Sequence, residues 1–416
     1  MTENVPIEIA GAGPAGLAAA ITLARAGRTV VVHEAQDEVG HRFKRDLQGL
    51  ENWTTRQDTL AVLQDLGITT DFQWLPCRQG TVFDAWDQAY PIRSREPLFY
   101  MVERGPGPDT LDTALLRQAA GLGVEVHFNS RLRHAHGPAI FATGPKAADA
   151  IAVGYHFDTR MADGFWAICD DGLAPKGYGY LLVMGGKGTV KSCMFTGFKQ
   201  EAHYVRHTIQ AFERLVGLEM IDPRPHGGVG NFRIPGMAHS GVHAVVGEQA
   251  GFQDTLWGFG MRAAITSGVL AARSLLEGSD YDRLWQRELG ALMTTAVVNR
   301  ALYSLLGNRG YRWLLNHQEN RSDARELLHR YYSPSRVKRL LAPLARQLFR
   351  RQVVGDVGKP DRGGNAGGAG QRREQHRLGD AIAVIGGQHR ARGVVVARQA
   401  EVERVVAPAV AHMVEQ

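Results

Sequence analysis

The sequence predicts an α/β fold, in which an N-terminal βαβ domain is followed by an inserted antiparallel β domain and a helical C-terminal part. Three observations support this prediction. Residues 6–35 read as strand, glycine turn, helix and strand, residues 150–240 alternate in the manner of antiparallel strands, and residues 281–350 carry apolar side chains at helical spacing. A chain of 416 residues also exceeds the roughly 250–300 residues that one core serves, so more than one structural unit is expected.

The N-terminal segment holds the glycine pattern of a dinucleotide-binding turn. An apolar run meets Gly11-Ala12-Gly13-Pro14-Ala15-Gly16, a helical pattern follows, and the next strand ends at Glu34. Gly11 permits the tight turn, Gly13 lets the backbone approach a pyrophosphate, and Gly16 lets helix and strand pack closely. The pyrophosphate would lie at the helix N-terminus, and Glu34 would accept hydrogen bonds from the adenosine ribose. The order predicts a Rossmann-type domain, but it does not separate FAD from NAD.

Four further blocks lie downstream of this motif. They are EVGHRFKRDLQGLENW after Glu34, Tyr100–Arg104 with the helical pattern 111–119, Phe141-Ala142-Thr143-Gly144-Pro145, and Val245–Phe252 with Trp257-Gly258-Phe259-Gly260-Met261. Together with the glycine turn, these blocks resemble the geranylgeranyl-reductase-like flavoproteins, part of the wider group that includes para-hydroxybenzoate hydroxylase. The resemblance covers roughly residues 5–350 and implies that the bound dinucleotide is FAD.

The resemblance also implies which residues contact the cofactor. A basic residue, Arg42 or Arg45, would lie near the flavin, although either could equally be a solvated loop charge, and Arg104 would support the FAD. Glu248 stands where the family usually has Asp and would bind a ribityl hydroxyl, while the helix after it would point its N-terminus at the flavin. A turn without a ligand is the alternative for this block. The predicted cofactor contacts are Gly11, Gly13, Gly16, Glu34, Arg42, Arg104, Glu248, Gly251, Gly258 and Gly260.

Residues 151–239 differ from the preceding segment in residue pattern, and we expect them to form the substrate-binding part of the molecule. Their alternation and their β-branched and aromatic residues favour an antiparallel sheet. Residues 174–180 resemble, in part, the family motif that lines a prenyl-chain cavity, with Tyr180 at the position of its Trp. We therefore expect Tyr178, Tyr180 and Trp257 to contact a hydrophobic substrate, the alternative being that these aromatic residues are plain core. Residues 185–188 read as a hairpin turn rather than a phosphate loop.

The sequence contains none of the common motifs for nucleophilic catalysis, disulfide exchange or metal binding. No Ser/His/Asp arrangement, CxxC or HExxH motif occurs, and no metal site is expected. The three cysteines, Cys77, Cys169 and Cys193, are expected to be buried thiols. No second glycine turn between strand and helix is found, so the reductant would be NAD(P)H that docks transiently, or an electron-donor protein. No catalytic side chain is assigned, because the flavin would carry the chemistry.

The basic charge of the chain is concentrated late in the sequence. The net charge is +6, and residues 300–351 alone contain twelve Lys or Arg against three Asp or Glu. A basic amphipathic helix within residues 330–351 could lie on an anionic membrane surface, or it could pack on the FAD domain with a solvated face. No nucleic-acid motif accompanies the charge, so no nucleic-acid partner is expected. With neither a signal peptide nor a long apolar run, we expect a cytoplasmic protein, free or peripheral to the inner face of the membrane.

These observations predict a domain plan and a function. Residues 1–150 and 240–280 would form the FAD-binding domain, 151–239 the antiparallel substrate domain, and 281–351 the helical region, while 352–416, which lack aromatic residues, would be a disordered or out-of-frame tail. The expected function is an FAD-dependent oxidoreductase that reduces carbon–carbon double bonds of a hydrophobic, perhaps prenylated substrate. A flavin monooxygenase and a non-catalytic redox sensor or assembly partner are the alternatives.

Overall fold

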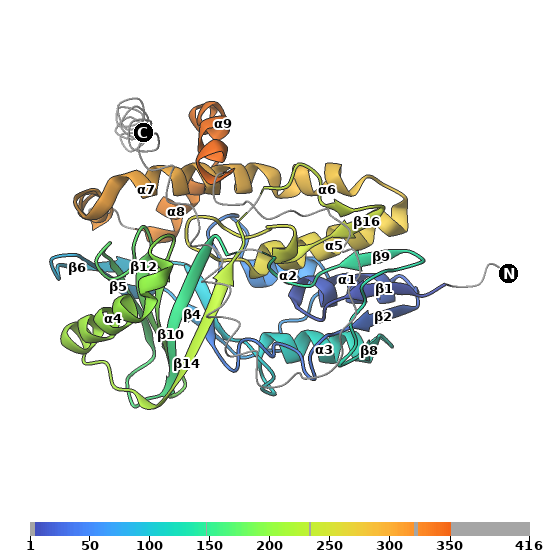
Figure 1. The fold of residues 1–416 in the computed structure, drawn as a ribbon, viewed down its shortest axis with the longest axis horizontal. Helices are drawn as coiled ribbons and strands as arrows, with labels where there is room; N and C mark the ends of the chain where they lie inside the picture. Colours follow the sequence, from blue (N-terminus) through green and yellow to red (C-terminus); the bar gives the residue numbers. More distant parts are fainter. Residues whose placement is uncertain (1–4, 147, 233, 320–322, 351–416) are drawn as a thin grey trace.

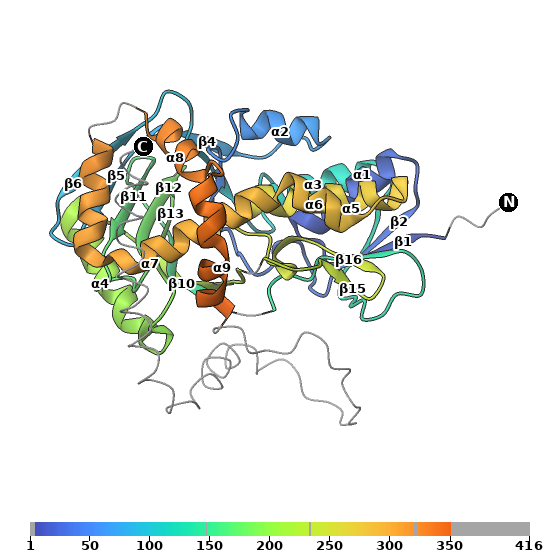
Figure 2. The same cartoon turned by 90° about the horizontal axis from the view of Figure 1, so that it is seen from above.

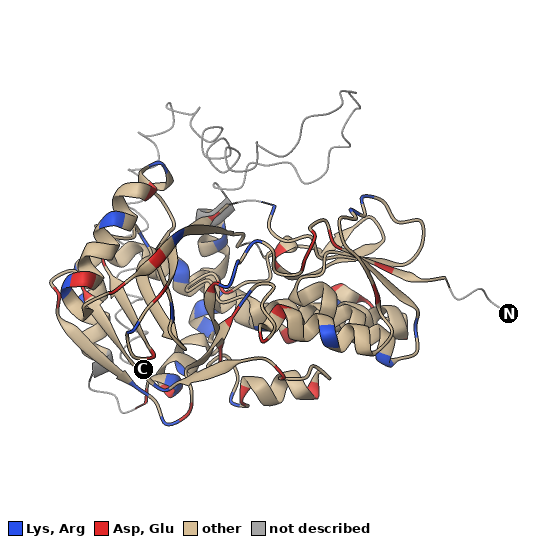
Figure 3. Ribbon diagram, turned by 90° about the horizontal axis from the view of Figure 1, so that it is seen from below, with Lys and Arg blue, Asp and Glu red and all other residues tan. Residues whose placement is uncertain are grey.

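The computed structural model describes residues 5–350 except for 147, 233 and 320–322, and the predicted tail lies outside these residues. The described chain forms two lobes, and a layer of C-terminal helices covers one side of both (Figure 1). Figure 2 shows α7 crossing from one lobe to the other. Lys, Arg, Asp and Glu occur on both lobes in the view of Figure 3. The predicted fold class is confirmed.

The first lobe contains a six-stranded sheet of the predicted Rossmann type. Its order is β15 (His239–Ser240), β16 (His243–Val245), β9 (Ala139–Phe141), β1 (Ile7–Ala10), β2 (Val30–His33) and β8 (Glu125–His127). All neighbouring strands are parallel except the β15–β16 pair. The helices of this lobe are α1 (Pro14–Arg25), α3 (Leu111–Gly121) and α5 (Met261–Glu277). Small residues let α1 and α5 touch, since a Cβ on Gly268 would lie 2.0 Å from the Ala15 carbonyl oxygen.

The second lobe is built on a seven-stranded sheet. Its order is β14 (Ile221–Gly230), β10 (Ala150–Asp158), β13 (Lys187–Met194), β12 (Tyr178–Met184), β11 (Gly164–Cys169), β5 (Gln79–Asp84) and β6 (Ala89–Arg93). Every pair is antiparallel except β11–β5. The sheet therefore extends beyond the predicted range 151–239, because β5 and β6 come from residues assigned to the first domain. Strand β5 pairs with β11 far along the chain, and β6 pairs with β5, which no local pattern reveals.

Helix α4 (Glu201–Val216), which follows the short 3-10 helix η1 (Phe198–Gln200), covers the outer face of this sheet. Leu181, Val183 and Phe212 pack together there. Because side chains alternate along a strand, the intervening residues of β12 face inward, toward the first lobe. A three-stranded sheet of β3 (Leu47–Glu51), β7 (Phe99–Glu103) and β4 (Trp74–Cys77), with α2 (Thr59–Asp65) nearby, lies between the lobes.

The C-terminal helices are α6 (Tyr281–Glu288), α7 (Gly290–Glu319), α8 (Ala324–Tyr332) and α9 (Arg336–Arg350). Gly307 interrupts α7 with φ 60° and ψ −174°, which produces a kink. Buried Ala342 and Ala345 of α9 pack against Val297, Val298 and Ala301 of α7. Within the described residues, a membrane-spanning length and composition is reached by no helix alone, only jointly by α6 and residues Gly290–His317, which meet at 56°.

Candidate cofactor and substrate site

The carboxyl ends of four parallel strands meet at one edge of the six-stranded sheet. From this edge extend the glycine turn after β1, Glu34 after β2, residues 142–144 after β9, and the 3-10 helix η2 (Gly247–Gln249) after β16. Dinucleotides bind in the crevice at such an edge in open α/β sheets. Both predicted fingerprints therefore lie at the same position, although more than 200 residues separate them in the sequence.

The three glycines of the first turn have different local roles. Gly11 has φ +102°, and a Cβ there would lie 2.4 Å from the Ala142 carbonyl oxygen. A Cβ on Gly16 would lie 2.0 Å from the Gly11 carbonyl oxygen, so this residue allows the helix to approach the turn. A Cβ on Gly13 would have no atom of the described residues within 4 Å. Gly13 is also the N-cap of α1 and lines the cavity, so the space beside it is available to a ligand.

Glu34 is tied to the glycine turn. Its Oε2 accepts a hydrogen bond from the Ala12 amide at 2.8 Å, and its Oε1 accepts one from the Gln36 amide at 3.0 Å. A carboxylate oxygen can accept a second bond, so both oxygens retain capacity for ribose hydroxyls. The structure thus gives Glu34 an additional task, which is to fix the backbone of the turn.

The second fingerprint is joined to the first through Gln249. Its Oε1 accepts hydrogen bonds from the Thr143 amide at 2.7 Å and the Thr143 hydroxyl at 2.9 Å. This bridging role of Gln249 was not predicted. Gly251 takes φ +89° in the same turn but is not part of the cavity lining.

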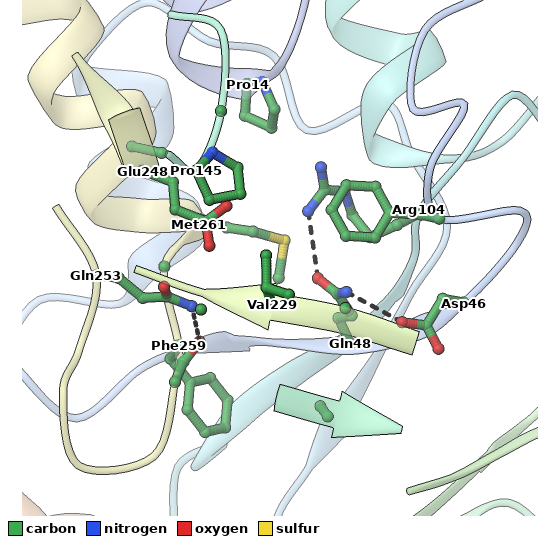
Figure 4. Close-up of a pocket in the computed structure, with 18 of the residues that line it drawn as sticks. Pro14, Asp46, Gln48, Arg104, Pro145, Val229, Glu248, Gln253, Phe259 and Met261 are labelled. Carbon is green, nitrogen blue, oxygen red and sulfur yellow. Dashed lines mark hydrogen bonds between the residues drawn. The ribbon is translucent and has the colours of Figure 1, made fainter. Parts of the chain in front are cut away.

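Glu248 and Arg42, which both line the cavity, form an ion pair. Arg42 Nη2 lies 2.7 Å from Glu248 Oε2, with 16% of the glutamate side chain and 45% of the arginine side chain exposed. Figure 4 shows the Glu248 carboxylate beside Pro145 and Met261, on the opposite side from Arg104. Both predicted residues line the cavity, and their contact with each other was not predicted. Arg45 instead pairs with Glu103, at 2.5 Å.

Arg104 also lines the cavity, but most of its donors have protein partners. It makes two hydrogen bonds to Asp112, at 2.7 and 2.8 Å, and a longer one of 3.3 Å to Gln48. Its guanidinium lies 4.1 Å from the centroid of the Phe43 ring. Arg104 therefore connects β7 to the start of α3 and holds the wall on which Gln48 and Asp46 lie (Figure 4).

The cavity has a volume of about 1030 Å³ and runs from the glycine turn to a chamber between the lobes. This is near the upper end for small-molecule sites. Tyr178, Tyr180 and Trp257, the three residues predicted to contact a substrate, line the chamber together. The Tyr178 hydroxyl donates to the Trp257 carbonyl oxygen, and the ring centroids of this pair are 5.3 Å apart.

The loop before α5 is held by two acids, Glu51, which is buried, and Asp254, which is partly buried. Glu51 forms an ion pair with Arg262 in the first turn of α5. Asp254 accepts hydrogen bonds from the Trp257 amide and the Tyr332 hydroxyl, both at 2.8 Å, and burial raises its pKa to about 6. Gly258, with φ +81°, and Gly260, the N-cap of α5, lie between Asp254 and Arg262 in the sequence. Both glycines line the cavity. The positive end of α5 therefore faces the cavity.

A buried ion pair beside the chamber was not predicted. Lys191 Nζ lies 2.6 Å from Asp46 Oδ2, and 3% or less of either side chain is exposed. Thr189 and Gln48 also donate to Asp46, each at 3.1 Å. Burial alone would raise the pKa of Asp46, but Lys191 and His226 lower it below its ordinary value. A lysine at an inward position of a strand was the only sequence signal for this pair.

The cysteine prediction is confirmed, because all three cysteines are buried and free. Cys169 and Cys193 line the cavity, and burial raises the pKa of each thiol to about 11. Both are therefore neutral thiols at pH 7, and they add to the apolar character of the chamber.

Comparisons with known proteins agree with this arrangement. Residues 9–51 match the NAD(P)-binding Rossmann-like domain. A digeranylgeranylglycerophospholipid reductase of Haloferax volcanii is 23% identical over 372 residues, which cover 76% of this chain and 89% of that protein. A geranylgeranyl bacteriochlorophyll reductase-like structure from Thermoplasma acidophilum, 16% identical, matches with a TM-score of 0.62 over 84% of this chain and 99% of its own.

The same fold also occurs in proteins of other activities. A flavin-dependent brominase, 13% identical, matches with a TM-score of 0.59 over 83% of this chain and 99% of its own. At these identities the structural matches establish the fold and leave the reaction open. The chain has the fold of the FAD-dependent oxidoreductases, and in sequence and fold it resembles the geranylgeranyl-reductase-like flavoproteins, as its motifs predicted.

Proposed function

We propose that this protein is an FAD-dependent reductase of carbon–carbon double bonds in a hydrophobic substrate, such as a prenylated one. The observation that carries this proposal is the single cavity that extends from Gly13 at the N-terminus of α1 to the aromatic chamber around Tyr180. A dinucleotide at the first end and an apolar ligand at the second would share one continuous cavity. The related reductase of Haloferax volcanii supports reduction over the other reactions of this fold.

The residues present fit FAD. The open space beside Gly13 and the N-terminal amides of α1 would hold the pyrophosphate, and Glu34 would bind the adenosine ribose. The N-terminus of α5, with Gly258 and Gly260, would lie near the flavin, where its positive end favours negative charge. FAD, when bound, supplies the two-electron chemistry. The chain itself binds, orients and excludes water, and we propose NAD(P)H or an electron-donor protein as the source of electrons.

This function is tested with the FAD-reconstituted protein under anaerobic conditions. We expect NADPH, or reduced ferredoxin as a protein donor, to bleach the flavin absorbance, and geranylgeranial, a prenyl aldehyde, as a probe to restore it. Mass spectrometry should then detect a product heavier by two hydrogens for each double bond reduced. Reoxidation that requires oxygen and yields a hydroxylated product would instead favour a monooxygenase. A flavin that no donor reduces would favour a non-catalytic role, and failure to take up FAD would overturn the proposal.

We also propose that α9 contacts anionic membrane surfaces. Arg336, Arg339 and Leu340 are exposed on its outer side, and 80% of Leu340 is accessible to solvent, although α9 packs on α7. An exposed leucine beside two exposed arginines suits the boundary between headgroups and acyl chains. Each arginine near an anionic surface contributes about 1 kcal/mol, so two of them correspond to roughly a 30-fold change in binding.

The membrane proposal predicts the behaviour of a double variant. Arg336→Gln/Arg339→Gln should bind vesicles with 30% phosphatidylserine roughly 30-fold more weakly than the unchanged protein in sedimentation assays. Arg160→Gln/Arg283→Gln is the matched control, because both arginines are more than four-fifths exposed and lie on other elements. Equal losses in the two double variants, or equal binding to neutral phosphatidylcholine vesicles, would contradict the proposal.

A further inference from the structure

Tyr180 lies in the chamber, and its hydroxyl has no hydrogen-bond partner among the described residues. The other tyrosines that line the cavity use theirs within the protein. Tyr178 donates to the Trp257 carbonyl, Tyr303 to the Gly177 carbonyl at 3.1 Å, and Tyr311 to Asp171 at 3.1 Å. Tyr180 is partly buried and lines the cavity, so its hydroxyl is available to a partner on the ligand.

Tyr180 lies next to a second donor. It pairs directly with Lys191 across β12 and β13, and opposite residues of an antiparallel pair point to the same face, with Cβ atoms about 5 Å apart. Both side chains line the cavity. The Lys191 ammonium has three N–H donors, and Asp46 is its hydrogen-bond partner among the described residues. Two donors therefore lie together on the inner face of the sheet.

The charges around these donors select the kind of acceptor. Lys191 and Asp46 form an ion pair of 2.6 Å whose charges cancel. His226 lies 3.8 Å from Asp46, and burial, reinforced by Lys191, lowers its pKa, which keeps the ring neutral at pH 7. An anionic ligand at Tyr180 would meet the Asp46 carboxylate, and the Lys191 ammonium beside it is already paired with that carboxylate. The pair of donors therefore suits a neutral oxygen acceptor rather than a carboxylate or phosphate.

The rest of the chamber restricts the ligand further. Apolar and aromatic side chains surround the two donors, among them Phe165, Leu182 and Trp257. A ligand that fills this space is mostly hydrocarbon and has one polar group at a defined place. A site that hydrogen-bonds such a group rejects analogues that lack it.

We propose that Tyr180 and Lys191 bind a neutral carbonyl oxygen of the ligand, so that the substrate is a hydrophobic carbonyl compound rather than a plain hydrocarbon or an anion at this position. The binding of a carbonyl oxygen by these two residues does not depend on the proposed function. Only the description of the ligand as a substrate rests on it. Donors on the carbonyl oxygen would draw electron density from a double bond conjugated to it, which assists reduction of that bond.

The experiment compares 9-fluorenone with fluorene, two planar molecules that differ in a carbonyl and a methylene group. Quenching of Trp53 and Trp257, which line the cavity, reports binding. We expect the unchanged protein to prefer fluorenone, and Tyr180→Phe to weaken fluorenone binding about three- to tenfold while fluorene binding stays the same. In Tyr180→Phe, the carbonyl stretch of bound fluorenone should also shift from its position in the unchanged protein toward its value in an apolar solvent. A purely structural effect of the substitution would not cause this shift.

Tyr155→Phe is the matched control, because Tyr155 packs on the opposite face of the same sheet, under α4. It should change neither affinity nor the carbonyl stretch. The proposal is wrong if fluorenone does not bind, if it binds no more tightly than fluorene, or if Tyr180→Phe weakens both equally. Since the assay is run with and without FAD, a protein that takes up FAD normally but shows no carbonyl preference rejects this inference alone. Retained preference without FAD uptake rejects only the proposed function.

Discussion

Gly13→Val should abolish FAD binding and leave the fold of the protein intact. Gly13 has φ −77° and ψ 177°, which valine adopts readily, and its side-chain direction is open for 4 Å. The added methyl groups would occupy the space that a pyrophosphate needs beside the α1 amides. Loss of two charge-assisted hydrogen bonds corresponds to about 3–6 kcal/mol, so the dissociation constant should rise at least 100-fold. Flavin fluorescence titration of the purified apoprotein measures this change.

Two other glycine substitutions make this result specific. Gly121→Val is the matched control, because Gly121 also faces open space but lies at the exposed end of α3, outside the cavity lining, and FAD affinity should not change. Gly16→Val should instead lower the thermal midpoint of the apoprotein, since its Cβ would overlap the Gly11 carbonyl oxygen. If Gly13→Val bound FAD with unchanged affinity, the pyrophosphate would not lie at this turn.

The parts of the site that the sequence could predict are those defined by local chain geometry. The turn from Gly11 to Gly16 and the acid at Glu34 lie within 24 residues, and each is needed by the backbone next to it. Such requirements appear as residue types at fixed spacing. The N-cap position of Gly260 could be predicted for the same reason, because a strand-to-helix turn must precede α5.

Pairings between distant segments could not be predicted in this way. Arg42 and Glu248 were each expected near the cofactor, but their ion pair joins residues 206 positions apart. Arg104 was expected to support FAD, whereas most of its donors bind Asp112 and Gln48. Tyr180 was predicted to contact a hydrophobic substrate, but the lack of a hydrogen-bond partner for its hydroxyl among the described residues depends on where distant segments lie. Pattern and composition specify what a strand buries, but not which strand it meets.

The Asp46–Lys191 pair joins residues 145 positions apart, and it too could not be predicted from the sequence. Breaking this pair should cause a large loss of stability. Asp46→Asn should destabilise the protein by about 3–5 kcal/mol, because it leaves the Lys191 ammonium buried without a counter-charge. Urea unfolding of the apoprotein at pH 7 measures this loss. Asp87→Asn is the matched control, since the Asp87–Arg214 pair is more than half exposed and should contribute no more than about 1 kcal/mol.

A double variant and the pH dependence test whether the charge interaction between Asp46 and Lys191 causes this loss of stability. Asp46→Asn/Lys191→Met removes both charges and should recover most of the lost stability, whereas additive losses would mean that the two charges do not stabilise each other. The native pKa of Asp46 is below its ordinary value, so its contribution is present above about pH 4, the unfolded value, and is lost as the pH falls through the native one. The stability difference between the unchanged protein and Asp46→Asn should therefore shrink on acidification below pH 4. A difference that stayed constant there would show that the carboxylate charge is not what holds Lys191 in the chamber wall.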